Sequence, residues 1–174
     1  AEIGSGSSHS CARLDNGSVN CWGQNSYVGI DTNSNQFSPV TVDNITTASQ
    51  FSVGIDHTCA RLSNGTVKCW GYGSNGRLGN GSTSSSISPV VVSGITTAQQ
   101  VSASHTHSCA VLSDKTVKCW GRNNLKQLGD GTTTDRSTPV TVSGVTNASM
   151  VSLGKEYNQE FSCALLDNGT VKCW

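Results

Sequence analysis

The eight cysteines of this chain are the residues whose types and spacing most clearly allow chemistry. They form four pairs in which the two cysteines are ten positions apart: Cys11 and Cys21, Cys59 and Cys69, Cys109 and Cys119, and Cys163 and Cys173. Such pairs can form disulfides, ligate zinc or remain as buried thiols. Structural zinc sites usually place their cysteines about two to four residues apart, so the spacing favours four disulfides over a zinc site.

The first pair lies in a predicted β-hairpin whose turn fixes the pairing. The turn at 15–17 (DNG) is typical of a three-residue turn with glycine in the left-handed position, and it pairs Leu14 with Ser18. Counting outward, Cys11 faces Cys21 at a non-hydrogen-bonded position, where Cα atoms approach to about 4.5 Å, within disulfide range. The same count holds for the other pairs. Each bridge closes a short loop, which stabilises the fold by roughly 2–3 kcal/mol.

The third hairpin departs from the others at its turn. It has Asp114-Lys115 where the other copies have Asn-Gly. Lysine in the left-handed conformation costs about 1 kcal/mol. We therefore expect either local strain in this hairpin or a different turn.

Three histidines, His9, His57 and His107, stand two positions before the first cysteine of their pairs. Equivalent histidines around a ring could converge on a metal ion near the axis. The alternative is a repeated hydrogen bond beside the hairpin. The fourth copy has Phe161 at this position, which interrupts any ring of ligands, so we predict no metal site. A further histidine, His105, lies outside the pattern and is expected to be exposed.

Composition excludes several classes of function. Lysine plus arginine (11) balances aspartate plus glutamate (11), which gives no electrostatic basis for binding nucleic acid. No apolar run approaches the roughly 18 residues of a membrane helix, so we predict no membrane insertion. The chain also lacks the G-x-S-x-G, H-E-x-x-H, P-loop and dinucleotide-binding motifs. We therefore predict no cofactor and no enzymatic activity, and four disulfides predict a secreted or cell-surface protein, extracellular or periplasmic.

The elements that position these residues are repeated along the chain. The stretch HSCARLDNGSVNCWG at 9–23 recurs, with substitutions, at 57–71, 107–121 and 161–174. A block beginning with Ser/Thr-Pro-Val recurs at 38–54, 88–104 and 138–154, and a third block recurs at 73–81 and 123–131. The first copy departs from the third block, because its segment 26–30 (SYVGI) lacks the L-G-x-G ending and is two residues shorter before Pro39.

The repeat predicts an all-β fold. Each copy offers about four short strands: one before the first cysteine, two in the cysteine hairpin, and the Pro-Val-x-Val segment. Four antiparallel strands in about fifty residues are typical of a β-propeller blade. We predict one domain, 1–174, with repeats at about 1–48, 49–98 and 99–148 and an incomplete repeat at 149–174.

These motifs resemble the RCC1 repeat family. The matching residues are the H-[ST]-C-A-x-L-x-x-G-x-V-x-C-W-G stretch and the L-G-x-G stretch, seen best at 75–81 and 123–131. The resemblance covers essentially the whole chain. It implies about 3.5 repeats of a seven-bladed propeller, and the paired cysteines are similar to the extracellular bacterial branch.

The family resemblance implies a rigid ring whose loops bind another protein. Members include a nucleotide exchange factor for a small GTPase that also docks on chromatin, a plant ultraviolet receptor and a secreted bacterial β-lactamase inhibitor. A chromatin-docking surface should be basic, whereas this chain is neutral. The receptor uses clustered tryptophans, but here one occupies the same position in each copy, which indicates core packing (Trp22, Trp70, Trp120 and Trp174). Exchange-factor or inhibitor activity is an expectation by family analogy alone.

Departures from the repeat are the candidate binding segments. Lys155–Glu160 contains a four-residue insertion relative to the other copies, and it is the most charged stretch. Inserted loops on one face are where propellers usually bind partners. The loops that follow the tryptophans are second candidates. The predicted binding residues, which would otherwise be solvated loop tips, are Lys155, Glu156, Tyr157, Asn158, Tyr72, Arg77, Arg122 and Lys126.

Together these features predict a non-catalytic extracellular recognition module that binds a protein or surface glycan through its loops. The alternative is a structural spacer or assembly subunit of a cell-surface structure or filament. The chain has four cysteine hairpins but only three Pro-Val-x-Val strands, and an open repeat array exposes its core. We therefore expect either further chain beyond Ala1 and Trp174 or self-association that completes the ring.

Overall fold

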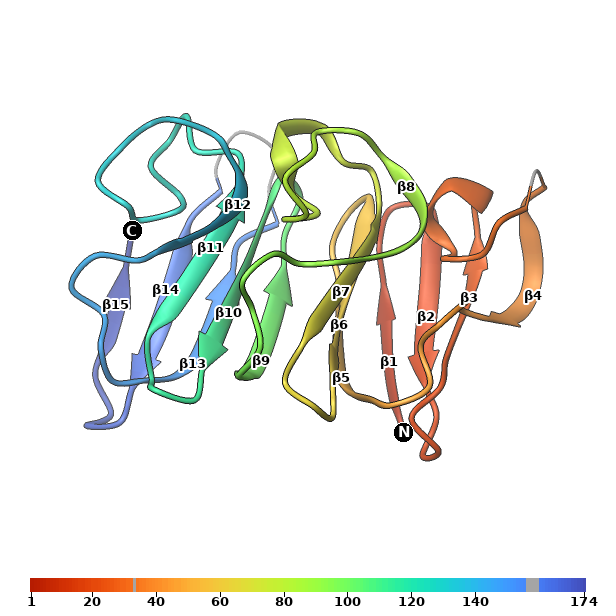
Figure 1. The fold of residues 1–174 in the computed structure, drawn as a ribbon, viewed down its shortest axis with the longest axis horizontal. Helices are drawn as coiled ribbons and strands as arrows, with labels where there is room; N and C mark the ends of the chain where they lie inside the picture. The colour runs from red at the N-terminus through yellow and green to blue at the C-terminus, as the bar shows by residue number, and fades with distance from the viewer. Residues whose placement is uncertain (33, 156–159) are drawn as a thin grey trace.

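The chain folds into four antiparallel β-sheets that stand side by side (Figure 1), which confirms the all-β class. The computed structural model describes residues 1–32, 34–155 and 160–174. We call each sheet a blade and number the blades along the chain. Blade 1 contains β1 (Glu2–Ser5), β2 (His9–Arg13), β3 (Val19–Gly23) and β4 (Gln36–Thr41), and blade 2 contains β5 (Ala48–Val53), β6 (His57–Leu62), β7 (Val67–Gly71) and β8 (Ser86–Val91). Blade 3 contains β9 (Ala98–Ala103), β10 (His107–Leu112), β11 (Val117–Gly121) and β12 (Arg136–Thr141), and blade 4 contains β13 (Ala148–Leu153), β14 (Ser162–Leu166) and β15 (Val171–Cys173).

The strands of each blade follow one another in sequence order. The first strands of neighbouring blades contact one another, so β1, β5, β9 and β13 form the inner side of the array. The fourth strands, β4, β8 and β12, form the opposite edge of their sheets. Two 3-10 turns, η1 (Asn25–Tyr27) and η2 (Ser74–Gly76), lie in the loops between the third and fourth strands. The sheets therefore have the order, strand number and repetition that the sequence predicts.

The structure contains the four disulfides that the hairpin register predicts. In blade 1 the Leu14 N–H donates to the Ser18 carbonyl at 2.9 Å, and Cys11 lies opposite Cys21. Their Cα atoms are 4.1 Å apart. The same spacing is 4.1 Å for Cys59–Cys69, 4.0 Å for Cys109–Cys119 and 4.0 Å for Cys163–Cys173.

The third hairpin was expected to have either local strain or a different turn, and the structure supports local strain. Lys115 has φ of 65°, close to the 83° of Gly17 and the 80° of Gly65 at the equivalent turns. Its N–H donates to the Leu112 carbonyl at 3.0 Å, as glycine does in the other copies. The turn is therefore the same, and lysine is held in a left-handed conformation that an L-residue adopts at a cost.

Replacing Lys115 with glycine is expected to stabilise the chain by about 0.5–1 kcal/mol, because relief of the left-handed strain exceeds the added entropy of the unfolded chain. The lost ion pair between Lys115 Nζ and Asp167 (3.3 Å) is exposed and contributes little. Urea unfolding at neutral pH measures the difference. In the matched control, Lys118→Gly, the residue is in extended strand β11, so glycine there should destabilise. A Lys115→Gly variant no more stable than the wild type would contradict the prediction.

Each apolar core lies between two neighbouring blades. Trp70 of blade 2 is fully buried and packs with Cys11, Val19 and Val28 of blade 1. Its indole Nε1 donates to the Tyr27 carbonyl at 3.0 Å. The equivalent bonds run from Trp120 to the Arg77 carbonyl (2.9 Å) and from Trp174 to the Gln127 carbonyl (3.0 Å). Core packing of the repeated tryptophans is therefore confirmed where a preceding blade is present.

The L-G-x-G motif accommodates these tryptophans. Gly79 lies against Trp120, and a Cβ on Gly79 would come within 2.7 Å of the indole Nε1. Gly79 also has φ of 70°, which favours glycine. Gly29 occupies the same place beside Trp70, so the first copy keeps the essential glycine although its motif is degenerate.

The repeated histidines form hydrogen bonds between blades. His9 Nε2 lies 2.8 Å from Thr58 Oγ1 of blade 2, His57 Nε2 lies 2.7 Å from Ser108 Oγ of blade 3, and His107 Nε2 lies 2.9 Å from Ser162 Oγ of blade 4. Each bond therefore joins one blade to the hydroxyl that precedes the first cysteine of the next. The fourth histidine, His105, is 15% exposed at its side chain and lies 4.0 Å from Asp56, so its expected exposure was wrong.

Two glutamines join the inner strands of neighbouring blades. The side-chain amide of Gln50 in β5 donates to the Val101 carbonyl at 2.9 Å, and its oxygen accepts from the Val101 N–H at 2.8 Å. Gln100 forms the same pair of bonds with Val151, at 2.9 and 2.6 Å. Each glutamine therefore supplies a short β-like pairing between strands of different sheets.

Candidate functional site

One end of the blades carries the loops that sequence analysis selected. The loops after the tryptophans meet the turns between the first and second strands, because the Tyr72 N–H donates to the Asp56 carbonyl and the Arg122 N–H to the Thr106 carbonyl. The cysteine hairpin turns lie at the other end, the lower one in Figure 1. We define the loop face as residues 24–32, 54–56, 72–85, 104–106 and 122–135.

The predicted binding residues of the post-tryptophan loops are spread over the loop face. The Arg77 guanidinium carbon lies 4.9 Å from the ring centroid of Tyr72, and Tyr72 is 43% exposed. Arg122 is half-buried, whereas Lys126 is exposed. Arg77 is only 3% exposed, and its guanidinium donates to the carbonyls of Ser74 (3.0 Å) and His105 (2.6 Å). Arg77 therefore anchors its loop and does not lie at a solvated tip.

The inserted segment falls partly outside the described residues. Glu156, Tyr157 and Asn158, which were predicted to bind, are among the four residues 156–159 that the structure does not describe. Lys155 is exposed, and its Nζ donates to the Val53 carbonyl of blade 2 at 2.8 Å. Glu160, the last residue of the segment that was predicted to contribute to binding, is only 6% exposed. The last residue of the insertion is therefore structural.

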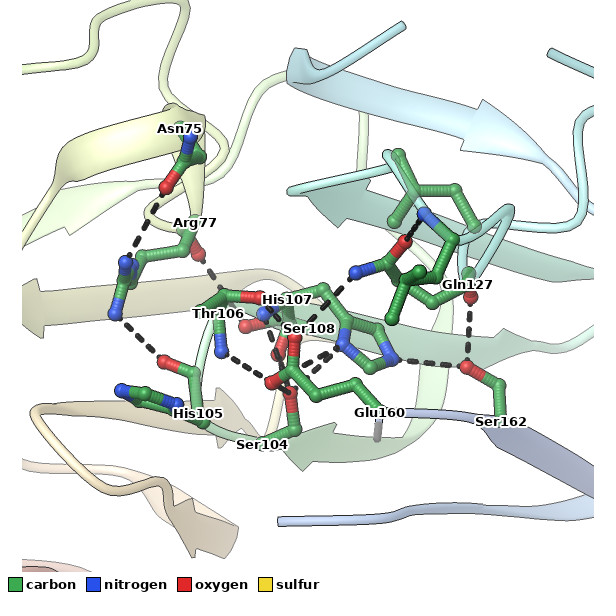
Figure 2. A network of polar contacts seen from close by, with 12 residues as sticks. Asn75, Arg77, Ser104, His105, Thr106, His107, Ser108, Gln127, Glu160 and Ser162 are labelled. Atoms are coloured by element: carbon green, nitrogen blue, oxygen red, sulfur yellow. Dashed lines mark hydrogen bonds and ion pairs between the residues drawn. The ribbon is translucent and has the colours of Figure 1, made fainter. Parts of the chain in front are cut away.

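Glu160 is the centre of a buried polar network at the joint of blades 3 and 4 (Figure 2). One carboxylate oxygen accepts from the Thr106 N–H at 2.7 Å and from the Ser104 hydroxyl at 3.1 Å. The other accepts a short hydrogen bond from the Thr106 hydroxyl and lies 3.4 Å from the side-chain amide of Gln127. The carboxylate, which comes from blade 4, therefore bonds both to the turn between β9 and β10 and to the loop that follows Trp120 in blade 3.

The electrostatic setting of Glu160 keeps it ionised. Burial alone raises the pKa of this carboxyl, but hydrogen bonding to His107 and Thr106 and the attraction of His107 more than offset burial, so the pKa falls from 4.5 to about 2. His107 Nδ1 is 3.8 Å from the nearer carboxylate oxygen and 2.8 Å from the Ser104 hydroxyl. A buried negative charge is thus stabilised by several converging donors.

Ser162, His107 and Glu160 follow one another in the order of a serine–histidine–carboxylate triad, but the geometry does not allow nucleophilic attack. Ser162 and His107 are completely buried. The Ser162 hydroxyl donates to the Gln127 carbonyl at 2.7 Å, which occupies its proton in a structural bond. A catalytic serine must reach an external substrate. This arrangement therefore holds two blades together.

A groove opens on the loop face at the joint of blades 1 and 2. It has a volume of about 370 Å³ and is lined by Ser26, Tyr27, Gly71, Tyr72, Ser85 and Ile87. Blade 1 supplies Ser26 and Tyr27 through η1, and blade 2 supplies the other four residues. We call it the tyrosine groove. It is mostly apolar with a few hydroxyl groups at its wall, which is the composition of small-ligand sites.

The shorter loop of the first copy distinguishes this joint from the next. At the joint of blades 2 and 3, the Asn75 amide donates to the Asp135 carboxylate at 2.8 Å, and the Gly81 N–H donates to the Ser137 carbonyl at 2.9 Å. Gly76 also lies so close to Ser137 that a Cβ would come within 2.4 Å of its Cα. Among the described residues, no such bonds connect η1 with β8. The full-length loop of blade 2 therefore closes its joint with blade 3, whereas the shorter loop of blade 1 leaves a groove at its joint with blade 2.

The two tyrosines of the groove have free hydroxyls and fixed rings. Among the described residues, neither hydroxyl has a hydrogen-bond partner. The Tyr27 ring lies 5.5 Å from the His9 ring, and the Tyr72 ring is held beside Arg77. Burial, Asp56 and Tyr72 raise the pKa of Tyr27, so its hydroxyl stays protonated at neutral pH. Both hydroxyls can therefore donate to and accept from a ligand.

Sequence reasoning found one side of this groove and missed the other. Tyr72 was selected, but Ser26 and Tyr27 were noted only as a departure from L-G-x-G. The signal that could have found them is the two-residue shortening, since a shorter loop beside a full-length one leaves space. Glu160 could have been found as the residue next to Phe161, where the histidine of the repeat is missing.

Family models match more than half of the chain. One model described as "Regulator of chromosome condensation (RCC1) repeat" matches residues 64–111 and 116–158, and a second with the same description matches 1–27, 48–77 and 98–127. No curated protein sequence matches the chain significantly.

Several solved structures share the fold. Human WBSCR16 superposes with a TM-score of 0.86 at 20% identity, covering 100% of this chain and 47% of that protein. Yeast RCC1 (Prp20) bound to Kap60 gives a TM-score of 0.77 at 20% identity, covering 99% of this chain and 41% of that one. A second structure of Prp20p from Saccharomyces cerevisiae gives 0.76 at 20% identity, with 99% and 42% covered. The chain thus spans less than half the length of these similar proteins.

Proposed function

The chain belongs to the RCC1 repeat family, and from this premise we propose that it is a non-catalytic recognition module that acts outside the cell and binds a protein or surface glycan through its loop face. One observation carries the proposal. The residues that repeat from copy to copy are used inside the blades and their joints, whereas the loop-face position after each Trp-Gly pair differs between copies, as in Gln24, Tyr72 and Arg122. A rigid repeat scaffold that presents variable loops is suited to binding.

The solved relatives support a protein partner. Yeast RCC1 was solved bound to Kap60, and the second structure of Prp20p is described with its binding to Gsp1p and histones. Identity to these proteins is 20%, so they support protein binding as the kind of function and do not identify the partner. Exposed Tyr72 and Lys126 provide an aromatic ring and a positive charge on the loop face.

The disulfides support the proposed location. Four bridges in one chain indicate an oxidising compartment, which for most organisms lies outside the cytosol. In the part of the chain that the structure describes, no helix has the length and apolar character needed to cross a bilayer.

A second candidate function is assembly through the ends of the blade array. Ile3 in β1 is 72% exposed, whereas its counterparts Phe51 and Val101 in β5 and β9 are 3% and 1% exposed beneath the preceding blade. Phe37 in β4 is 94% exposed. This apolar end of blade 1 favours contact with a further blade, either from the same polypeptide or from a second copy.

One experiment separates the two candidates. The chain and a loop-face variant, Tyr72→Ala with Lys126→Ala, are used to capture partners from the surface fraction of the source organism, and the same samples are analysed by sedimentation velocity. Loop-face recognition predicts a partner that the variant retains at least tenfold less well, while the opposite-end control Leu14→Ala with Lys115→Ala retains it. Assembly predicts self-association that neither variant changes. A partner retained equally by both variants would contradict recognition through the loop face.

A further inference from the structure

The lining of the tyrosine groove has the chemistry of a site for a neutral ring that bears hydroxyl groups. Tyr27 and Tyr72 offer aromatic rings, and Ile87 adds an aliphatic surface. The hydroxyls of Ser26 and of both tyrosines have no protein partner among the described residues. The Ser85 hydroxyl accepts from the Gly73 N–H at 3.1 Å and keeps its proton to donate. Apolar surface with converging donor-acceptor groups is therefore present in one hollow.

None of the six described residues that line the groove is charged. The positive charge of Arg77 lies beside the Tyr72 ring and is held by two backbone carbonyls. The Asp56 carboxylate accepts from the Ser7 hydroxyl at 2.7 Å and lies 4.0 Å from His105. A charged ligand would lose its hydration in the groove without gaining an ionic partner, so a neutral ligand is favoured.

From this lining we propose that the tyrosine groove binds one or two residues of a neutral saccharide. The proposal rests on the proposed function, because it names the ligand class for part of the loop face. A pyranose ring presents C–H groups on its faces, which pack on tyrosine rings, and hydroxyls on its edge, which donate and accept. Tyrosine and serine hydroxyls match this double character, since each also donates and accepts.

A proline-rich peptide is the main alternative ligand for a groove with two tyrosines. Such peptides dock their rings in aromatic grooves and use backbone carbonyls, which only accept hydrogen bonds. Here the lining carries four hydroxyls within one hollow of about 370 Å³, at the lower end of small-molecule sites. A short, hydroxyl-rich groove suits a sugar ring better than an extended peptide.

The groove is a specific feature of one joint. The sealing contacts between Asn75 and Asp135 and between Gly81 and Ser137 close the equivalent place at the next joint. We therefore expect one such saccharide site among the described joints of this chain, between blades 1 and 2.

Saturation-transfer NMR tests the proposal with the intact, disulfide-bonded chain. The probes are the methyl glycosides of glucose, galactose, mannose and N-acetylglucosamine and their β-linked disaccharides, at up to about 10 mM, followed by a glycan microarray. We expect at least one neutral saccharide to bind. Tyr72→Ala should weaken its binding at least tenfold, and Tyr72→Phe should weaken it about threefold because the ring stays.

Two further variants guard against loss of folding. Ser26→Phe fills the groove while leaving Tyr72 and Arg77 in place, and it should also weaken binding at least tenfold. Phe37→Ala removes an exposed aromatic ring outside the groove and should leave binding unchanged. All variants are compared at equal thermal stability or with their melting curves reported.

The possible outcomes separate this inference from the proposed function. No binding by any neutral saccharide overturns the inference, as does saccharide binding that Tyr72→Ala and Ser26→Phe leave unchanged. Binding of a proline-rich peptide that Tyr72→Ala abolishes overturns the saccharide inference but supports recognition through the loop face. Neutral saccharide binding lost in both groove variants and kept in Phe37→Ala supports it.

Discussion

Reduction of the four disulfides is expected to unfold the chain at 25 °C and neutral pH. Each bridge contributes roughly 2–3 kcal/mol by limiting the unfolded chain, so the four together are comparable with the about 5–15 kcal/mol that stabilise a typical domain. The bridges in blades 1 to 3 are fully buried, whereas Cys173 in blade 4 is exposed. A phosphine reductant should therefore open Cys163–Cys173 first and cause loss of β-sheet circular dichroism as the others follow.

Paired variants test the same point one bridge at a time. Replacing both Cys109 and Cys119 with alanine removes a bridge inside the core between blades 3 and 4 and should cost more than replacing Cys163 and Cys173, because a cavity is added to the lost constraint. Thermal melts of the two variants give the comparison. Alkylation and mass spectrometry report which cysteines are free. A chain with all eight thiols free and an unchanged melt would show that the disulfides are dispensable.

Replacing Glu160 with alanine is expected to lower the free energy of unfolding by about 3 kcal/mol at pH 7. The change leaves the Thr106 N–H and the Thr106 hydroxyl without their buried acceptor, and each unsatisfied buried group costs roughly 1–3 kcal/mol. Glu160→Gln keeps one acceptor oxygen and should cost less. The matched control is Glu2→Gln, since Glu2 is half-exposed and lies 3.7 Å from Arg13, a contact of little value. Urea unfolding of the three variants provides the measurement.

The same residue predicts a pH dependence with a defined sign. The pKa of Glu160 is about 2 in the folded chain and near 4.5 when unfolded, so the unfolded state takes up this proton first as the pH falls. Its stabilisation is present above pH 4.5 and is lost between about pH 4.5 and 2. Buried His9, whose pKa is lowered by desolvation from 6.5 to about 4, gives a separate loss between those values. Glu160→Gln should reduce the loss of stability in the lower window, to which Asp130 with its pKa lowered to about 2 still contributes, and should keep the upper window. An unchanged acid profile would rule out this role for Glu160.

The elements that repeat could be predicted from the sequence, because several copies show the same strand and turn pattern where a single copy would allow more than one assignment. The pairing of Cys11 with Cys21 follows from one turn and a count of residues, and three further copies obey the same count. The position of Trp70 in a core also follows from its repetition. What repetition cannot give is the neighbour that each residue touches, and most of the joints are built by contacts about fifty residues apart in sequence.

The parts of the site that escaped prediction depend on those distant contacts. Arg77 and Glu160 are charged residues in loops, and composition alone places such residues in water. Each is buried because a neighbouring turn offers backbone groups at the right distance, such as the His105 carbonyl for Arg77 and the Thr106 N–H for Glu160. The tyrosine groove likewise arises from the difference between two loops of successive blades, which no single motif reveals.

The interchangeable joints of the array also bear on how such a gene can change. His9 meets Thr58 in the same way that His57 meets Ser108, so either blade could follow either partner and keep this bond. Unequal recombination between copies would then add or delete a whole blade in frame and keep the histidine bond at each junction. Blade 4 differs at both joint positions, because Phe161 replaces the histidine of the other copies and Met150 replaces the glutamine of blades 2 and 3, whereas blade 1 has Glu2 at the glutamine position. A copy of blade 4 would carry two missing bonds, so duplication should be tolerated best for blades 2 and 3.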